Sequence, residues 1–159
     1  MIKKFIIIFS ISICIIGFAT AIALTPNDSL PKNKLNSLII EDLSNSNFEN
    51  MDLSGIDFSG KNLPNSNFEE SIIFGSNFRL VNLENANFKN ANLSGADLAE
   101  ANLSGADFSN AILEHARLYK TIIIDANFEG ADLTRTNFCG QDLVGRAFVG
   151  ANLRGADLH

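Results

Sequence analysis

One apolar position recurs every fifth residue along most of the chain. From residue 41 onward each fifth residue is Leu, Phe or Ile, with no exception and no insertion. A small residue, usually Ala, stands two positions before each of these central residues, and Asn or Asp usually stands one position before it. Ser-Gly often follows, so residues 91–95 (Ala-Asn-Leu-Ser-Gly) show the repeat in pure form.

This period of five fits neither a helix nor a flat strand. Helical spacing would scatter the central residues around a cylinder, and strand spacing would send alternate ones to opposite faces. The chain is therefore predicted to turn once per repeat, with every central side chain pointing to the same inner side. Gly or Asn after the central residue supplies the corner, because both accept the positive φ of a tight turn.

The aromatic residues indicate how many repeats close one coil. Every fourth central residue is phenylalanine in one series, whereas the series that start at Leu43 and Leu53 hold only Leu and Ile. Four repeats, or 20 positions along the chain, are therefore expected to make one coil, with like residues stacked on like. About six coils at the spacing of parallel strands give a rod about 29 Å long. The series that forms the predicted phenylalanine stack is Phe48, Phe68, Phe88, Phe108, Phe128 and Phe148.

This pattern resembles the pentapeptide-repeat family. The resemblance covers residues 41–159, with a leading unit at 36–40 centred on Leu38. It implies an all-β fold, a right-handed parallel quadrilateral β-helix. The motif residues are structural, so the resemblance predicts the fold far more strongly than the function.

Residues 1–24 differ from the rest of the chain. Lys3 and Lys4 precede a long apolar stretch, and two small-x-small sites end at Ala21 and Ala23, which is the order of a secretory signal. Residues 1–23 are thus predicted to be a helical signal peptide, cleaved after Ala21 or Ala23. An alternative stays open: residues 5–24 carry no charge and are long enough for an uncleaved membrane anchor. Both interpretations place the rest of the protein outside the cytoplasm, in the periplasm or the extracellular space.

The segment 24–40 and the end of the chain bear on how the solenoid is closed. Pro26 and Pro31 lie in residues 24–40, which we interpret as a linker followed by a short cap over the first coil. The sequence ends within a repeat, at Leu158 and His159, so we expect an uncapped last coil. An uncovered strand edge favours pairing with another molecule, and a symmetric homodimer through the C-terminal coil would close it.

Charge and cysteine content exclude some functions. The chain has 12 basic and 18 acidic residues and a net charge of −6. An acidic body argues against direct nucleic-acid binding, which needs clustered Lys and Arg. After signal cleavage Cys139 would be the one cysteine left, so no internal disulfide is expected and stability must come from packing.

No residue group in the sequence indicates catalysis or a bound metal. Asp97, Asp107, Asp132 and Asp142 could be taken for paired carboxylates, but they occupy the repeat position that Asn fills elsewhere. Short polar side chains there are expected to bond nearby backbone amides. The two histidines lack ligand spacing, so no metal site, no cofactor and no enzymatic activity are predicted.

Departures from the repeat are the positional clues to function. Outward positions normally hold Asn and Ser, and apolar residues there mark either an interaction site or tolerated drift. Both interpretations stay open for the candidate interaction patch, which is Ile122, Ile124, Val144 and Val149. A second, weaker group is Ile72, Phe74 and Ile112.

Two functional hypotheses follow. The favoured one is an exported, non-enzymatic module that binds an unidentified protein partner or has a structural role. The alternative comes from the family resemblance, because some members mimic DNA with an acidic rod and bind gyrase, which protects it from quinolones. Those members act in the cytoplasm and dimerise through a C-terminal helix, whereas this chain has an export signal and no such helix pattern.

Overall fold

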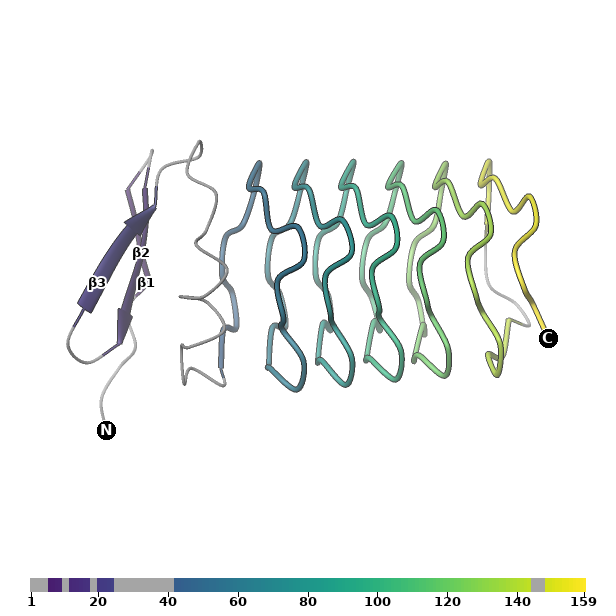
Figure 1. Ribbon diagram of the computed structural model, residues 1–159, viewed down its shortest axis with the longest axis horizontal. Coiled ribbons are helices and arrows are strands. Elements are labelled where there is room, and N and C mark those ends of the chain that lie inside the picture. Colours follow the sequence, from purple (N-terminus) through teal and green to yellow (C-terminus); the bar gives the residue numbers. More distant parts are fainter. Residues whose placement is uncertain (1–5, 10–11, 18–19, 25–41, 144–147) are drawn as a thin grey trace.

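The computed structural model describes residues 6–9, 12–17, 20–24, 42–143 and 148–159. The N-terminal part contains three strands, β1 (Ile6–Phe9), β2 (Ser12–Gly17) and β3 (Thr20–Leu24). They form an antiparallel sheet in the order β1-β2-β3, with Ile6 opposite Ile15 and Ile13 opposite Leu24 (Figure 1). Within the described residues no helix is long and apolar enough to cross a membrane.

The predicted N-terminal signal helix is not confirmed, because the described residues of this segment form strands. The apolar stretch is rich in isoleucine, whose branched Cβ lowers helix propensity and raises strand propensity. A continuous apolar run does not distinguish strand from helix by its pattern. The predicted linker and cap at residues 24–40 lie outside the described residues, apart from Leu24.

The body of the protein is an all-β solenoid of parallel coils stacked in one row (Figure 1). Bridges join residues 20 positions apart, as in Asp42 with Asn62 and Asn137 with Asp157. Each coil bonds to both neighbours: the Asn92 amide donates to the Ser71 carbonyl (2.9 Å), and the Leu93 amide donates to the Ile112 carbonyl (2.7 Å). The predicted circuit of four repeats is thus confirmed for the described residues.

Every fifth residue forms a corner. In residues 53–56 the Ile56 amide donates to the Leu53 carbonyl (3.1 Å), and Gly55 between them has φ 66°. A four-residue turn with positive φ at its third residue is a type II turn. The same positive φ recurs at each described corner from Asn45 to Gly155, and four such corners per circuit make the coil four-sided. The Gly and Asn corners predicted from the sequence are confirmed.

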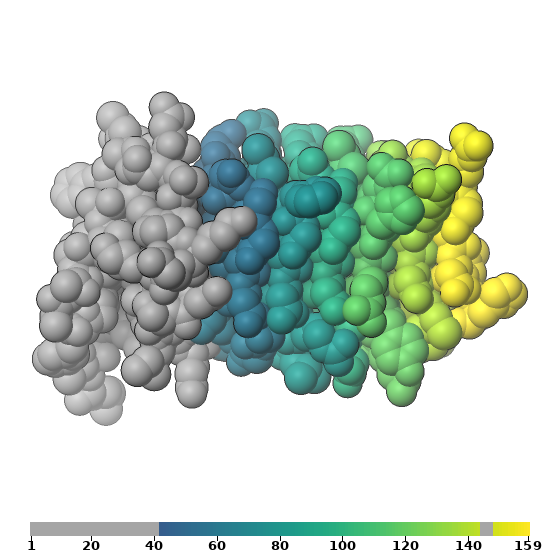
Figure 2. Space-filling view, viewed as in Figure 1, coloured from purple at the N-terminus to yellow at the C-terminus, as the bar shows by residue number. Residues whose placement is uncertain are grey.

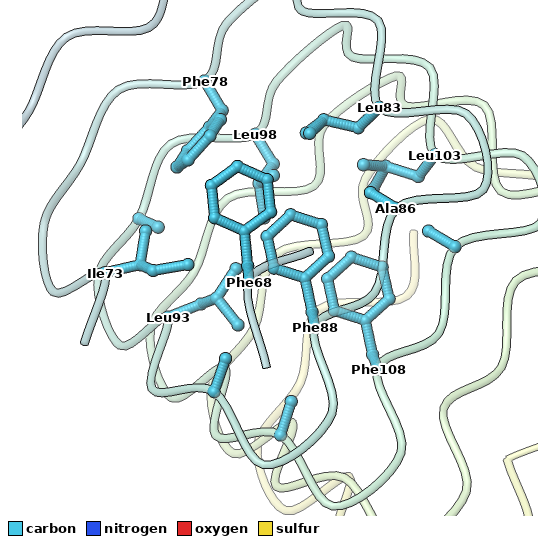
Figure 3. Packing of buried hydrophobic residues seen from close by; sticks show 14 of the residues in the cluster. Phe68, Ile73, Phe78, Leu83, Ala86, Phe88, Leu93, Leu98, Leu103 and Phe108 are labelled. Carbon is cyan, nitrogen blue, oxygen red and sulfur yellow. The ribbon is translucent and has the colours of Figure 1, made fainter. Parts of the chain in front are cut away.

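The core is a filled column of central side chains. The predicted phenylalanine series forms one stack, with ring centroids 4.7 Å apart for Phe68 and Phe88 and 4.8 Å apart for Phe88 and Phe108 (Figure 3). Phe58 and Phe78 form a second stacked pair (4.7 Å) and meet the first stack edge to face, as between Phe68 and Phe78 (5.8 Å). Aromatic pairs prefer these two geometries.

Polar side chains that enter the core find backbone partners. The Ser76 hydroxyl donates to the Leu53 carbonyl (2.7 Å), and the Thr136 hydroxyl donates to the Leu113 carbonyl (2.9 Å), in each case between neighbouring coils. Burial ends toward the C-terminus, where Leu143, Phe148 and Leu153 are only partly buried.

Candidate interaction surface

The four sides of the solenoid are named walls 1 to 4. Walls 1, 2, 3 and 4 are centred on the series that start at Leu43, Phe48, Leu53 and Phe58, respectively. Because central side chains point inward, the outward positions of each repeat are the residue before its centre, the residue after it and the corner; of these, Ala99 and Ser109 are nevertheless buried. Figure 2 shows the coils as successive bands across the surface, so each wall is a regular stack of outward positions.

Asn and Asp before the centre hold the backbone, as predicted. The Ser54 amide donates to Oδ1 of Asp52 (2.9 Å), and the same bond recurs in the repeats of Asn92 and Asp132. Asparagines in successive coils also bond each other: the Asn82 amide group donates to Asn62 Oδ1 (3.0 Å), and Asn102 donates to Asn82 (3.2 Å). These side chains form ladders along the rod, which explains why Asn predominates at this position.

Two aspartates have pKa values below their ordinary value of 3.8. The Ser59 hydroxyl and backbone amide lower the pKa of Asp57 by hydrogen bonding to its carboxylate. Partial burial alone would raise the pKa of Asp107, but hydrogen bonds from Ser109 and the charge of Lys89 outweigh it. These pKa shifts have structural causes and do not indicate a catalytic acid or base.

Most of the described arginine ion pairs lie on wall 4. Arg79 contacts Glu100 (2.7 Å), and Arg117 contacts Asp97 (3.1 Å). Since these side chains are 21–57% exposed, each pair contributes about 0–1 kcal/mol. Beside them the Lys120 ammonium lies 5.0 Å from the ring centroid of Tyr119.

When each charged residue is assigned to its wall, one side of the solenoid is acidic. In the described residues walls 1 and 2 carry nine carboxylates and two lysines, whereas walls 3 and 4 carry seven carboxylates and five basic side chains. A comparison of the N-terminal and C-terminal halves of the sequence does not show this asymmetry, because the residues of one wall are 20 positions apart. The carboxylates of walls 1 and 2 are Asp42, Glu49, Glu69, Glu70, Glu84, Asp107, Asp125, Glu129 and Asp142.

The structure brings together two residues of the predicted interaction patch. Ile122 and Ile124 flank the buried Ile123 on wall 1 and are 50% and 51% exposed. Val149 is 66% exposed but lies on wall 2, where its carbonyl accepts the Gly130 amide, so it is not continuous with the isoleucines. Val144 lies outside the described residues. The described part of the patch is therefore the pair Ile122 and Ile124, here named the wall 1 pair.

The second predicted group lies on wall 3. Ile72 (48% exposed) and Phe74 (59%) flank the buried Ile73 and are named the wall 3 pair. Ile112 is also exposed and lies two coils further along the same column, since Asn92 bridges both Ile72 and Ile112. In the wall 1 and wall 3 pairs, both outward residues of the repeat are large and apolar. In every other repeat whose two outward residues are described, at least one of these two residues is polar, charged or alanine.

Sequence reasoning missed two exposed apolar residues: Leu158, a central residue that was expected to point inward but is 48% exposed in the last coil, and Leu80. Leu80 is 61% exposed and occupies a corner with φ 59°, a conformation that bulky side chains disfavour. The sequence could have revealed Leu80 by its position in the repeat, because Gly or Asn occupies most other corners.

The remaining chemically active side chains stand apart. Among the described residues no group of three or more His, Cys, Asp or Glu side chains is arranged to hold a metal ion. His115 lies 3.6 Å from Glu114, and Cys139 is a partly exposed free thiol on wall 4.

This geometry defines a class, the parallel β-solenoids whose coils turn every five residues. The sequence profile of the pentapeptide repeats matches residues 42–79, 76–114 and 121–159. The chain belongs to the pentapeptide-repeat family, as its repeat pattern predicted. A search of curated protein sequences gave no match.

Solved structures with the same fold include three from photosynthetic organisms. A pentapeptide repeat protein from the Arabidopsis thaliana thylakoid lumen is 29% identical, with a TM-score of 0.64 over 70% of this chain and 77% of that one. A pentapeptide repeat protein from the cyanobacterium Cyanothece 51142 is 25% identical, with a TM-score of 0.61 over 80% and 95%. One from Nostoc Pcc 7120 is 32% identical, with a TM-score of 0.50 over 60% and 83%.

Proposed function

We propose that this chain is an exported, non-enzymatic binding module that engages a partner protein through the wall 1 pair. The observation that carries the proposal is the exposure of Ile122 and Ile124 in one repeat of an otherwise polar wall. Drift in a tolerant repeat would scatter single apolar residues, whereas both outward positions of this repeat have changed together. Contiguous exposed apolar side chains are a mark of interaction sites.

Charge suggests the chemistry of the partner. Asp125 forms the corner next to Ile124, and walls 1 and 2 are acidic as a whole. A partner that presents an apolar contact with a basic rim would match this surface in potential. Binding should then become slower as the salt concentration rises, because screening weakens electrostatic steering.

The order of the N-terminal segment supports export: two lysines, an apolar stretch and two small-x-small sites. A similar protein, from Arabidopsis, resides in the thylakoid lumen, which also lies beyond a membrane. Fractionation of expressing cells with N-terminal sequencing of the protein tests this part. A mature N-terminus near residue 22 or 24 is expected, and cytosolic protein that retains Met1 would contradict export.

Site-specific photo-crosslinking tests the binding surface. A crosslinking residue at position 104 lies one coil from Ile124, since the Gly105 amide bonds the Ile124 carbonyl. We expect an adduct in the parent protein that is lost after Ile122→Asn and Ile124→Ser, which restore the usual repeat residues. A crosslinking residue at the exposed Ser59 on wall 4 is the control. An adduct unaffected by the double substitution would contradict the proposal.

The acidic side favours one second candidate, the DNA-mimicking gyrase binder. Its test is a gyrase supercoiling assay with purified protein, in which charge-reversed Glu49→Lys and Glu69→Lys on wall 2 should abolish any protection from quinolone. Absence of an effect on gyrase at micromolar protein would exclude this candidate and leave the first untouched.

A further inference from the structure

The wall 3 pair, Ile72 and Phe74, lies on a different side of the rod from the surface assigned above. Both side chains are about half exposed and flank one buried centre, so an isoleucine and a phenyl ring stand side by side in one row. Ile112 adds a third exposed apolar side chain in the same column. We propose that wall 3 binds a second copy of this chain, with the two rods side by side and parallel.

The regularity of the wall favours a second copy as the occupant. Successive rows of wall 3 are 20 positions apart in sequence, and the coils stack in one row (Figures 1 and 2). An identical wall has the same spacing between strands, so every row of one rod meets a row of the other. Self-complementary surfaces of this kind are what a twofold interface requires.

With a twofold axis parallel to the rods, the wall 3 pair of one copy contacts the wall 3 pair of the second copy. Under that symmetry the residue before a centre faces the residue after the same centre in the second copy. Ile72 then meets Phe74 of the second copy, and Phe74 meets Ile72, so four apolar side chains close together. The ring provides a flat surface against the branched aliphatic chain, and both lose water.

The charged rows of wall 3 tolerate the same symmetry. Asp132 faces Thr134 of the second copy, Arg154 faces Asn152, and Asp52 faces Ser54. Glu114 faces Ile112 under the same symmetry, so the apolar contact is centred on the wall 3 pair. No described row of the wall places like charges opposite each other. The antiparallel alternative, centred on Asn92, would set Asp52 against Asp132 and Phe74 against Glu114. An antiparallel register centred on Ile73 avoids like charges but overlaps only the rows from Asp52 to Asn92. The parallel arrangement overlaps every described row without like charges opposite each other, and we therefore favour it.

Net charge also selects wall 3 over the acidic side. Wall 3 carries three carboxylates and two arginines in the described residues, so two copies repel little there. One wall is small for a protein interface, and interfaces below about 1,200 Å² of total buried area belong to weak, transient complexes. We therefore expect a dissociation constant on the order of 10 µM to 1 mM.

Sedimentation equilibrium tests the proposal with protein purified from cells that express the full chain. The parent protein should dimerise reversibly. The dissociation constant of the dimer should fall as the salt concentration rises, because screening weakens the repulsion between acidic monomers while the apolar contact persists. Ile72→Asn with Phe74→Ser should weaken the dimer about 100-fold or more, since four half-exposed apolar side chains are lost. This variant places at positions 72 and 74 the outward residues found at Asn92 and Ser94, so it should fold, and circular dichroism verifies that.

Two further variants separate this dimer from other associations. Ile122→Asn with Ile124→Ser changes the wall 1 pair in the same way and should leave dimerisation unchanged. Leu158→Asp disturbs the last coil and should also leave it unchanged. The proposal would be overturned if the parent protein were a monomer at all concentrations. It would also be overturned if Leu158→Asp abolished the dimer while Ile72→Asn with Phe74→Ser left it intact. Neither result would bear on partner binding by the wall 1 pair.

Disulfide trapping tests the orientation. In a background with Cys14→Ser and Cys139→Ser, Asn92→Cys protein is mixed with Ser94→Cys protein. The parallel twofold predicts crosslinks between the two variants. Crosslinks between two Asn92→Cys molecules alone would instead show the antiparallel arrangement and refute the parallel one.

Discussion

The phenylalanine stack on wall 2 allows a direct test of what holds the solenoid together. Phe88 is fully buried and lies parallel to two neighbours, with ring centroids 4.7 Å from Phe68 and 4.8 Å from Phe108. It also meets Phe78 edge to face at 6.4 Å. The perturbation is Phe88→Leu, which places at this position the residue that walls 1 and 3 use for the same purpose.

The expected cost follows from what leucine keeps and loses. Leucine retains most of the buried apolar volume, but both stacked contacts and the edge-to-face contact disappear, and each aromatic pair contributes about 0.5–1.5 kcal/mol beyond area burial. Phe88→Leu should therefore lower the free energy of unfolding by about 1.5–4.5 kcal/mol. Phe88→Ala also leaves a cavity and should cost about 3–5 kcal/mol.

Phe148 provides the matched control for the same substitution. It is partly buried and has one stacked neighbour among the described rings, Phe128, with centroids 5.5 Å apart. Phe148→Leu should cost about 1 kcal/mol less than Phe88→Leu, because one stacked contact is lost in place of two.

The assay is urea unfolding followed by far-ultraviolet circular dichroism, since the chain has no tryptophan. Equal m-values for parent and variants indicate that the same surface is exposed on unfolding. The reasoning would be refuted if Phe148→Leu cost as much as Phe88→Leu, or if Phe88→Leu were neutral. Either result would mean that burial alone, without ring stacking, accounts for the aromatic series.

Three further predictions concern the corners, the ladders and the charges. Leu80→Asn should raise the free energy of unfolding by about 0.5–1 kcal/mol, because asparagine tolerates the positive φ of this corner better than leucine does; a thermal melt that shows no gain would contradict the assigned strain. Asn82→Ala removes its bonds to Asn62 and Asn102 and should cost about 1 kcal/mol in urea unfolding, more than Glu129→Ala at an exposed position outside the ladder. The lowered pKa values of Asp57 and Asp107 mean that both carboxylates stabilise the fold above their ordinary pKa of 3.8 and lose that contribution as the pH falls through the lowered values. The melting temperature should therefore fall steeply at acid pH, and Asp57→Asn with Asp107→Asn should flatten that fall.

Much of the fold could be predicted because two positions of each repeat specify it. The central residue must be large and apolar, and the corner must accept positive φ, so both leave a regular trace in the sequence. The spacing of Phe48, Phe68 and Phe88 then fixed the size of the coil. The same reasoning did not predict the strands at the N-terminus. An unbroken apolar run such as residues 6–9 is compatible with a buried strand as well as with a helix.

The candidate surfaces were predicted less completely, for a geometric reason. Ile122 and Ile124 are neighbours in sequence and in space, so the sequence located them. Val149 appeared to continue the patch, but a corner and most of wall 2 separate it from Ile124. The acidic side required every residue to be assigned to its wall, because neighbours on a wall are 20 positions apart in sequence.

The repeat separates stability from recognition along the whole rod. Central and corner residues determine the fold, while most residues on either side of a centre face solvent and contribute mainly through the asparagine ladders. Selection for folding alone therefore gives no reason to place two large apolar side chains in the same repeat. The wall 1 and wall 3 pairs both do so, and replacing either pair by Asn and Ser restores ladder donors at no cost to the core. If the two pairs are retained for binding, replacing either pair should leave the free energy of unfolding unchanged or raise it. The same replacement should weaken the association made by that pair.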